Sequence, residues 1–226
     1  MLPELSPLPD VVDAALLGPM LAPARTALLV IDVQNDFVAP DGALGRDGLD
    51  MAPLEEPLQR VEALIAAARA AGVTLVFVRV VTRPETDSNA LKLLTERKGQ
   101  QLDTVAICRA GTPGADYYRV QPRAGELEVE KPLYSAFAGT LLEPQLRARG
   151  IDTLLVCGFT TECCVDSTVR DAFHRDFNVF IAFDACAAYL PDLHHASLNA
   201  LALSCALLVD SHAAAQAWLL TTSAPL

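Results

Sequence analysis

Short apolar runs alternate with segments of helical periodicity along this chain, and that alternation limits its fold more than any other feature. Residues 27–31 read Ala-Leu-Leu-Val-Ile, a partly β-branched run typical of a strand buried on both faces. Residues 53–71 carry apolar side chains at helical spacing, and Gly72 is placed to end that helix. Further strands are expected at 73–81, 126–130, 153–157, 179–182 and 206–209, and further helices at 90–96, 140–149, 164–175 and 196–203. The pattern predicts an α/β fold with three layers, α-β-α, around a mostly parallel central sheet.

The length and composition favour one domain. The chain has 226 residues, of which 52% are hydrophobic, enough to bury a sizeable core. Residues 1–25 are rich in proline and are expected to form an N-terminal arm over the surface. Residues 26–226 are expected to form a single α/β domain.

The charge balance excludes several classes of partner. The chain has 17 lysines and arginines against 28 acidic residues, for a net charge of -11, which repels nucleic acids and anionic membranes. No apolar stretch approaches the roughly 20 residues that a membrane-spanning helix needs. The N-terminus lacks the basic region of a signal peptide, and the six cysteines form no C-x-x-C pair. We therefore expect a cytoplasmic protein that has neither nucleic acid nor a membrane as its partner.

Three residues at expected element ends are candidates for chemistry. Asp32 directly follows a buried strand, where a carboxylate is costly without a partner or a task. Lys131 follows a short strand, and Cys164 begins a helix whose dipole would stabilise a thiolate. Each residue could instead have a structural role. Asp32 could be a helix cap or part of an ion pair, Lys131 could be an ordinary solvated lysine, and Cys164 could simply pack in the core. Periodicity also leaves open whether Cys163 or Cys164 points at a site.

Three motifs together resemble the isochorismatase-like cysteine hydrolase superfamily. The first is Leu-Val-Ile-Asp-Val-Gln-Asn-Asp-Phe at 29–37, and the second is Lys-Pro-Leu-Tyr-Ser-Ala-Phe at 131–137. The third, at 158–165, reads Gly-Phe-Thr-Thr-Glu-Cys-Cys-Val and resembles the nucleophile motif G-x-x-T-x-x-C-V. The resemblance covers nearly the whole chain, from about residue 26 to about residue 219.

The resemblance implies an activity and assigns roles to residues. It makes Cys164 the nucleophile rather than Cys163, with Asp32 as the general base and Lys131 beside it. It implies a cis peptide between Phe159 and Thr160, with the backbone N–H groups of Thr160 and Cys164 forming an oxyanion hole. The implied reaction is hydrolysis of a C–N bond in a small amide through a thioester. Members of the superfamily are usually dimers or tetramers, so a homo-oligomer is expected.

The resemblance also separates subfamilies. Nicotinamidases of this superfamily hold a metal with histidines between the aspartate and lysine motifs, whereas all four histidines here follow Cys164, so neither a metal nor another cofactor is expected. Isochorismatases cleave a vinyl ether and resemble this family with the cysteine replaced, so Cys164 favours amide chemistry. Residues 88–92 and 131–135 resemble ureidoacrylate amidohydrolases, which are related to N-carbamoylsarcosine amidases and biuret hydrolases. A linear amide, ureido or carbamoyl substrate is therefore expected.

The remaining candidates concern substrate binding. A guanidinium of Arg79 or Arg83 is suited to binding a substrate carboxylate, and a surface salt bridge is the alternative for both. The residues expected to line the pocket are Phe37, Asn89, Tyr134 and Phe159, with core packing as the alternative for Phe37.

Three other functions remain open at this stage. They are an isochorismatase-type ether hydrolase, a catalytically silent binding or scaffold protein of the same fold, and a redox sensor using Cys163 and Cys164.

Overall fold

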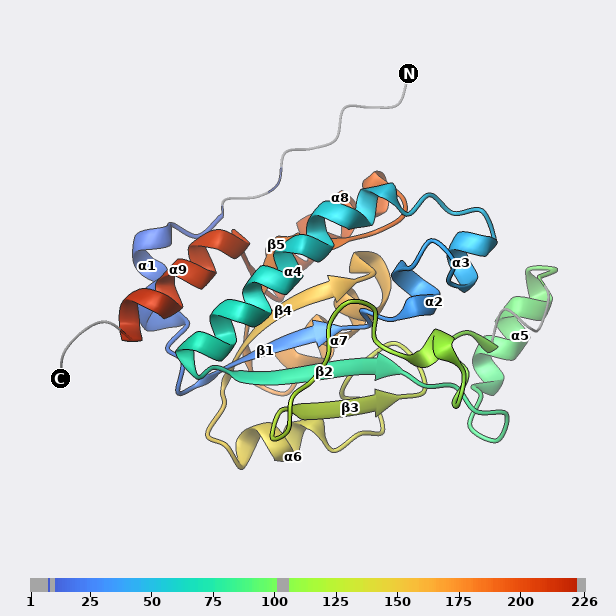
Figure 1. Cartoon of the computed structure of the whole chain (residues 1–226), viewed down its shortest axis with the longest axis horizontal. Coiled ribbons are helices and arrows are strands. Elements are labelled where there is room, and N and C mark those ends of the chain that lie inside the picture. Colours follow the sequence, from blue (N-terminus) through green and yellow to red (C-terminus); the bar gives the residue numbers. More distant parts are fainter. Residues whose placement is uncertain (1–7, 9–10, 101–105, 223–226) are drawn as a thin grey trace, which may run out of the picture.

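A parallel sheet forms the centre of the protein (Figure 1). The computed structural model describes residues 8, 11–100 and 106–222, and within them six strands form one sheet. The strands are β1 (Thr26–Ile31), β2 (Thr74–Val80), β3 (Leu127–Lys131), β4 (Thr153–Phe159), β5 (Asn178–Ala187) and β6 (Leu207–Val209). Their order is β3-β2-β1-β4-β5-β6, and every neighbouring pair is parallel. This confirms the predicted α/β class.

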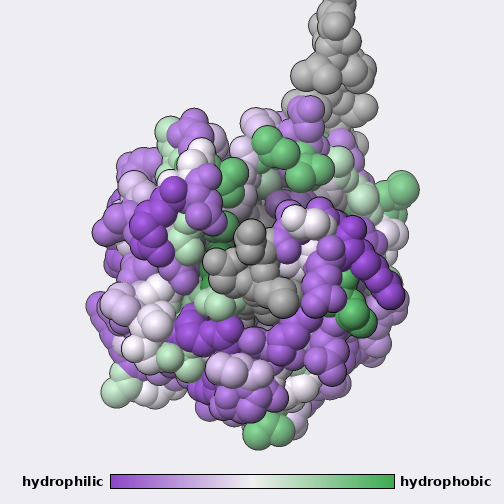
Figure 2. Space-filling model, turned by 90° about the vertical axis from the view of Figure 1, so that its right-hand side faces the viewer, coloured by the Kyte–Doolittle hydropathy of each residue, from purple (hydrophilic) through white to green (hydrophobic). Residues whose placement is uncertain are grey.

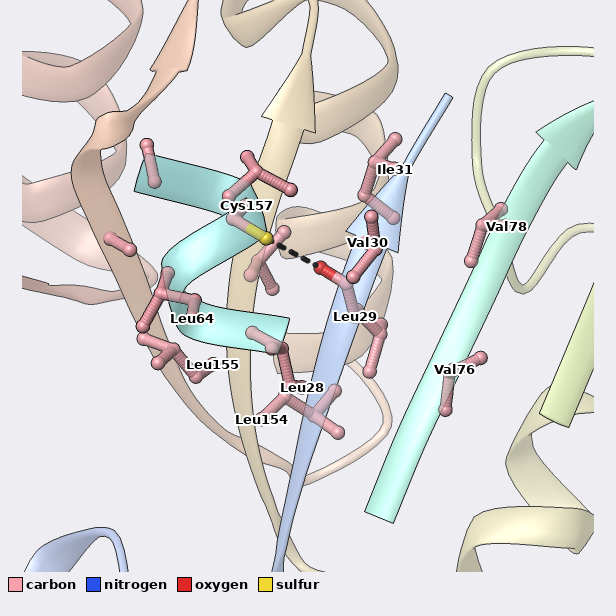
Figure 3. Packing of buried hydrophobic residues seen from close by; sticks show 14 of the residues in the cluster. Leu28, Leu29, Val30, Ile31, Leu64, Val76, Val78, Leu154, Leu155 and Cys157 are labelled. Carbon is pink, nitrogen blue, oxygen red and sulfur yellow. Dashed lines mark hydrogen bonds between the residues drawn. The ribbon is translucent and has the colours of Figure 1, made fainter. Parts of the chain in front are cut away.

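The central strands are buried because their sequences are apolar without interruption. All six residues of β1 and all seven of β4 are buried, as expected for strands covered on both faces. Figure 3 shows Leu28 and Leu29 of β1 beside Leu154 and Leu155 of β4. The Cys157 thiol lies in this core and donates a hydrogen bond to the Leu29 carbonyl at 3.5 Å. Cys157 therefore packs as a small apolar residue.

Helices cover both faces of the sheet. The helices α1 (Ala14–Met20), α4 (Ala52–Ala71) and α9 (Ser211–Thr222) pack together on one face. The opposite face carries α6 (Leu142–Arg147), α7 (Asp166–Phe173) and α8 (Pro191–Ser204). The helix α4 ends at Gly72, whose φ of 71° is the left-handed conformation that suits glycine. None of the described helices combines the length and apolarity that crossing a membrane requires.

The helix α8 is longer than expected, and α1 lies where no helix was expected. The helix α8 begins at Pro191, well before the expected residue 196, because proline fits the first helical position and Asp192 suits the positive end of the helix dipole. The range expected to be an N-terminal arm contains α1. Leu17 in α1 and Leu21 directly after α1 are both fully buried. The Trp218 Nε1–H donates a hydrogen bond to the Leu21 carbonyl at 2.9 Å. These two leucines belong to the hydrophobic core.

Short elements gather beyond the carboxyl ends of the strands, on the right in Figure 1. They are α2 (Asn35–Val38), α3 (Ala43–Arg46), α5 (Asn89–Arg97) and the 3-10 turn η2 (Pro113–Ala115). Asp36 holds two of these loops together, since its carboxylate accepts hydrogen bonds from the Ala43 and Cys108 N–H groups at 3.0 and 2.8 Å. Figure 2 looks onto this end, where hydrophobic surface appears in a hollow of a largely hydrophilic face.

Candidate active site

Asp32 lies at the point where the strand order reverses, beyond the end of β1 and between β2 and β4. In doubly wound sheets this reversal leaves a crevice where ligands bind. Asp32 is fully buried with a φ of 51°, a left-handed conformation that aspartate tolerates better than most residues. Its Oδ1 has no hydrogen-bond partner among the described residues. Burial raises the pKa of Asp32, against the lowering effects of the Lys131 charge and the Cys164 side chain.

Lys131 is the last residue of β3 and points toward Asp32. Its Nζ donates hydrogen bonds to Asp32 Oδ2 at 2.7 Å and to the Leu133 carbonyl at 3.0 Å. Burial is the largest single effect and lowers the pKa of Lys131, but the charges of Asp32 and Cys164 and the hydrogen bonds to them together outweigh burial, so that the pKa is raised overall. The lysine therefore keeps its positive charge next to the carboxylate.

Cys164 lies in a wide turn, η3 (Thr161–Val165), which connects β4 to α7. This turn is π-helical: the Val165 N–H donates to the Thr160 carbonyl, five residues earlier, at 3.2 Å. Single π-turns of this kind are frequent at functional sites. The expected helix from residue 164 therefore divides into this turn and α7, which begins at Asp166.

Contacts from α8 hold the η3 turn in place. The Ser197 hydroxyl on α8 bonds to the Thr161 carbonyl at 3.2 Å and to the Asp166 carboxylate at 2.9 Å. The Thr161 hydroxyl lies 2.8 Å from His194 Nδ1, and burial lowers the pKa of His194 to about 4. His194 is therefore neutral at physiological pH and serves the turn as a hydrogen-bond partner.

Gly158 brings the end of β4 against β1. A Cβ at this position would lie 2.1 Å from the Ile31 carbonyl oxygen, and the φ of 115° excludes most other residues. The peptide bond between Phe159 and Thr160 is cis, as the family resemblance implied. The chain then turns into η3, so that Cys164 returns to the Asp32 side of the sheet.

The Cys164 side chain lies within electrostatic reach of both Asp32 and Lys131. The Cys163 side chain, burial and the charge of Asp32 together raise the pKa of Cys164 well above its usual value, and Lys131 opposes them. Cys164 therefore holds its proton at rest. The Oδ1 of Asp32, which has no hydrogen-bond partner among the described residues, belongs to the carboxylate whose charge acts on this thiol.

A cavity of about 330 Å³ opens above these groups. Cys163, Cys164, Phe159 and Thr160 are among the residues that line it. The other lining residues are Phe37, Leu44, Val80, Thr82, Leu91, Thr95, Gln100, Ile107, Pro132, Leu133, Tyr134, Glu162 and Tyr189. Among the expected substrate-binding residues, Phe37, Tyr134 and Phe159 thus line this cavity.

The other three expected substrate-binding residues lie outside that lining. Arg79 and Arg83 each form an ion pair with Glu130, at 2.8 Å in both cases. Arg79 also stacks on the Tyr117 ring, 5.4 Å from its centroid. Asn89 is an exposed residue at the start of α5, and the same helix contributes Leu91 and Thr95 to the cavity instead.

Sequence reasoning did not identify Glu162 and Tyr189 as cavity residues. Glu162 stood within the nucleophile motif, beside the cysteines, so its position was a usable signal. Tyr189 follows β5, and its hydroxyl donates to the Phe37 carbonyl at 2.7 Å. That contact joins distant parts of the chain, and no local pattern indicates it.

The described residues contain no group of three or more histidine, cysteine, aspartate or glutamate side chains arranged to hold a metal ion. His194 and His195 lie on α8, behind the η3 turn. The geometry around Cys164 thus consists of a thiol, a carboxylate and an ammonium group.

Comparison with known proteins agrees with this arrangement. The family model for the isochorismatase domain matches residues 26–213. Ureidoacrylate amidohydrolase RutB from Methylobacterium radiotolerans is 36% identical over 191 residues, covering 79% of this chain and 73% of that protein. A cysteine hydrolase structure from Pseudomonas syringae pv. phaseolicola has a TM-score of 0.78 at 27% identity, covering 95% of this chain and 98% of that one.

A third relative carries a named activity. The structure of N-carbamoylsarcosine amidase from Thermoplasma acidophilum has a TM-score of 0.65 at 26% identity and covers 83% of this chain and 96% of that one. The family match spans more than half of the chain and includes Asp32, Lys131 and Cys164. The chain therefore belongs to the isochorismatase domain family.

Proposed function

We propose that this protein is a cysteine amidohydrolase, which cleaves the C–N bond of a small linear amide, ureido or carbamoyl compound through a thioester. The observation that carries the proposal is the buried Asp32–Lys131 ion pair, whose charges act on Cys164, a residue that lines the cavity. The names of the relatives, ureidoacrylate amidohydrolase and N-carbamoylsarcosine amidase, support the bond type.

The first step is attack by sulfur. Asp32 accepts the proton of the Cys164 thiol through its free Oδ1. The raised pKa of Asp32 makes its carboxylate a stronger base, better suited to removing that proton. The thiolate adds to the substrate carbonyl carbon, and the carbonyl oxygen becomes negative. Lys131 holds the carboxylate in position from its other oxygen, Oδ2, and offsets the negative charge of the site.

The negative oxygen needs donors fixed in advance. The backbone N–H groups of Thr160 and Cys164 are the proposed donors, because both residues line the cavity. The π-turn around Cys164, which is unusual backbone for a loop between strand and helix, supports this assignment.

The intermediate then collapses. The C–N bond breaks, Asp32 returns its proton to the leaving nitrogen, and ammonia or an amine departs, leaving the acyl group on Cys164 as a thioester. Water enters, Asp32 takes a proton from it, and the resulting hydroxide attacks the thioester. The acid product leaves, and the thiol regains its proton from Asp32.

Ammonia release tests this proposal. The purified protein, with EDTA present, is offered ureidoacrylate-like acids, N-carbamoyl amino acids, biuret, maleamate and nicotinamide. We expect release from a ureido or carbamoyl compound and its loss in Cys164→Ala. The matched control Cys205→Ala, which removes a thiol outside the cavity lining, should keep full activity. Ammonia release that persists in Cys164→Ala would refute the mechanism.

The same assay separates the alternatives. An ether-type substrate would be consumed without ammonia, and consumption would survive Cys164→Ala. A silent scaffold would turn over none of these compounds. Either result would overturn the proposed function.

A further inference from the structure

Branched apolar residues from four separate segments line the active cavity. Leu44 belongs to α3, Leu91 to α5, Ile107 to the loop before η2 and Leu133 to the loop after β3. All four are half-buried, so part of each side chain stays uncovered by the protein. Figure 2 shows hydrophobic surface in a hollow at this end of the molecule. Apolar surface gathered in a concave pocket is suited to binding an apolar group of a ligand.

None of the described lining residues carries a cationic side chain that could bind a substrate carboxylate. Residues 101–105, which follow the lining residue Gln100, contain no arginine or lysine in the sequence either. Arg79 and Arg83 lie outside the lining, and both pair with Glu130. A carboxylate that enters a largely apolar cavity without a cationic partner loses its hydration and gains no charge in return, which is costly.

Lys131, the lysine of the site, is already engaged by the protein. Its side chain is fully buried and is not part of the cavity lining. Its Nζ donates hydrogen bonds to Asp32 and to the Leu133 carbonyl. The ammonium charge therefore balances the Asp32 carboxylate, and a substrate carboxylate beside this pair would leave the site with an excess negative charge.

Two hydroxyl groups of the cavity wall are engaged in the same way. The Thr82 hydroxyl donates to the Ile107 carbonyl at 2.8 Å, and the Tyr189 hydroxyl donates to the Phe37 carbonyl at 2.7 Å. A substrate carboxylate would have to compete with these carbonyls for the donors. An alkyl or aryl group needs no donor and gains free energy simply by leaving water.

We propose that the substrate carries an uncharged apolar group, alkyl or aryl, on its amide, ureido or carbamoyl unit, and that the apolar wall selects this group over a carboxylate. The proposal rests on the proposed function and specifies its substrate class. It separates this chain from the relative named for ureidoacrylate, whose name denotes an anion. Leu44, Leu91, Ile107 and Leu133 act as specificity-determining residues, and the bond is cleaved at Cys164.

Two ureas of matched shape test the proposal by turnover. 3-Methylbutylurea and 3-ureidopropanoate carry an isopropyl group and a carboxylate on the same two-carbon chain, and cleavage of either releases ammonia. For the wild-type protein, kcat/KM should be higher for 3-methylbutylurea by about tenfold or more. In the series propylurea, butylurea and pentylurea, each added methylene should raise kcat/KM about threefold. Equal values for the matched pair, or a preference for the carboxylate, would overturn the proposal while the amidohydrolase function stands.

A positive charge placed in the wall should shift the preference. Leu91→Arg adds a guanidinium to the side of α5 that lines the cavity, so the ratio of kcat/KM for 3-methylbutylurea over 3-ureidopropanoate should fall about tenfold or more. The matched control Leu93→Arg adds the same charge to the same helix at a residue that is 48% exposed and outside the lining. It should leave the ratio within about twofold of wild type. An equal shift in both variants would refute the role of the wall, and the wild-type ranking decides the proposal even if Leu91→Arg fails to fold.

Alkylation tests the same wall without turnover. Iodoacetate, iodoacetamide and N-butyliodoacetamide differ in carrying a carboxylate, an amide and a butyl group, and Cys164 labelling can be followed by peptide mass spectrometry in a Cys163→Ala background. With each rate divided by the rate of the same reagent with glutathione, Cys164 should react fastest with the butyl reagent and slowest with iodoacetate, over about a tenfold range. If no urea releases ammonia, the proposed function fails, and these rates still decide the preference of the cavity: equal or reversed rates refute it.

Discussion

Lys131 Nζ lies 2.7 Å from Asp32 Oδ2, and both side chains are fully removed from solvent. The two residues are 99 positions apart, and they reach each other across the end of β2, which separates their strands. Burying two charges costs several kcal/mol per ion, and only close pairing offsets that cost. Each charge therefore depends on the other.

Removal of the lysine alone should destabilise the fold. Lys131→Met leaves the Asp32 charge buried without its partner, and we expect the free energy of unfolding to fall by about 3–5 kcal/mol in urea titrations. The double variant Asp32→Asn/Lys131→Met should recover most of that loss and still release no ammonia. Equal stability of Lys131→Met and wild type would contradict the buried pair.

Because Gly158 lies close to the Ile31 carbonyl, replacing it should reduce stability more than replacing a glycine that only has a positive φ. Gly158→Ala should lower the free energy of unfolding by about 3 kcal/mol or more, because the added Cβ meets the Ile31 carbonyl. Gly125 also has a positive φ, of 92°, but open space around its Cβ position. Gly125→Ala should therefore cost only about 1–2 kcal/mol. Equal losses in the two variants would show that no clash exists at Gly158.

Asp32 should control the titration of Cys164. Its negative charge is one of the causes that raise the thiol pKa, so Asp32→Asn should lower that pKa and speed alkylation of Cys164 at neutral pH. The rate of iodoacetamide labelling against pH, measured in a Cys163→Ala background, should have its midpoint at lower pH than with Asp32 present. Ammonia release should nevertheless be lost, because the proton acceptor is gone. A midpoint that stays or moves to higher pH would contradict this electrostatic relationship.

Arg79 and Arg83 should have little effect on the substrate. Both are partly exposed and pair with Glu130, so Arg79→Met and Arg83→Met should each change stability by less than about 1 kcal/mol. Because both side chains lie outside the cavity lining, KM for the best substrate should change less than twofold. A tenfold rise in KM in either variant would contradict this prediction and show that the arginine contributes to substrate binding.

The sequence identifies those parts of the fold that depend on continuous local patterns. The apolar runs at β1 and β4 predict buried strands, and a polar residue directly after such a run predicts a place at the sheet edge where ligands bind. Asp32 became a candidate in this way, whereas Lys131 follows a short strand of alternating polar and apolar residues and owed its proposed role to the motif. The choice of Cys164 over Cys163 came from the motif, because two adjacent residues share the same local pattern.

Features that depend on the register between strands are not visible in the sequence. Arg79 and Glu130 stand directly opposite each other in the β2–β3 pair, and this register decides that the guanidinium binds a neighbouring carboxylate. The burial of Leu17 and Leu21 was hidden by the prolines around them, which indicated an arm over the surface.

The strand order has a consequence for the newly made chain. Because β2 lies between β1 and β3, the Asp32–Lys131 pair cannot close until all three strands are aligned, and Cys164 joins it only after β4 has docked on the other side of β1. During synthesis, the carboxylate of Asp32 therefore has no ammonium partner until Lys131, 99 residues further along the chain, has been made. Under the proposed mechanism, fragments that end before residue 164 would carry no activity, because they lack the thiol.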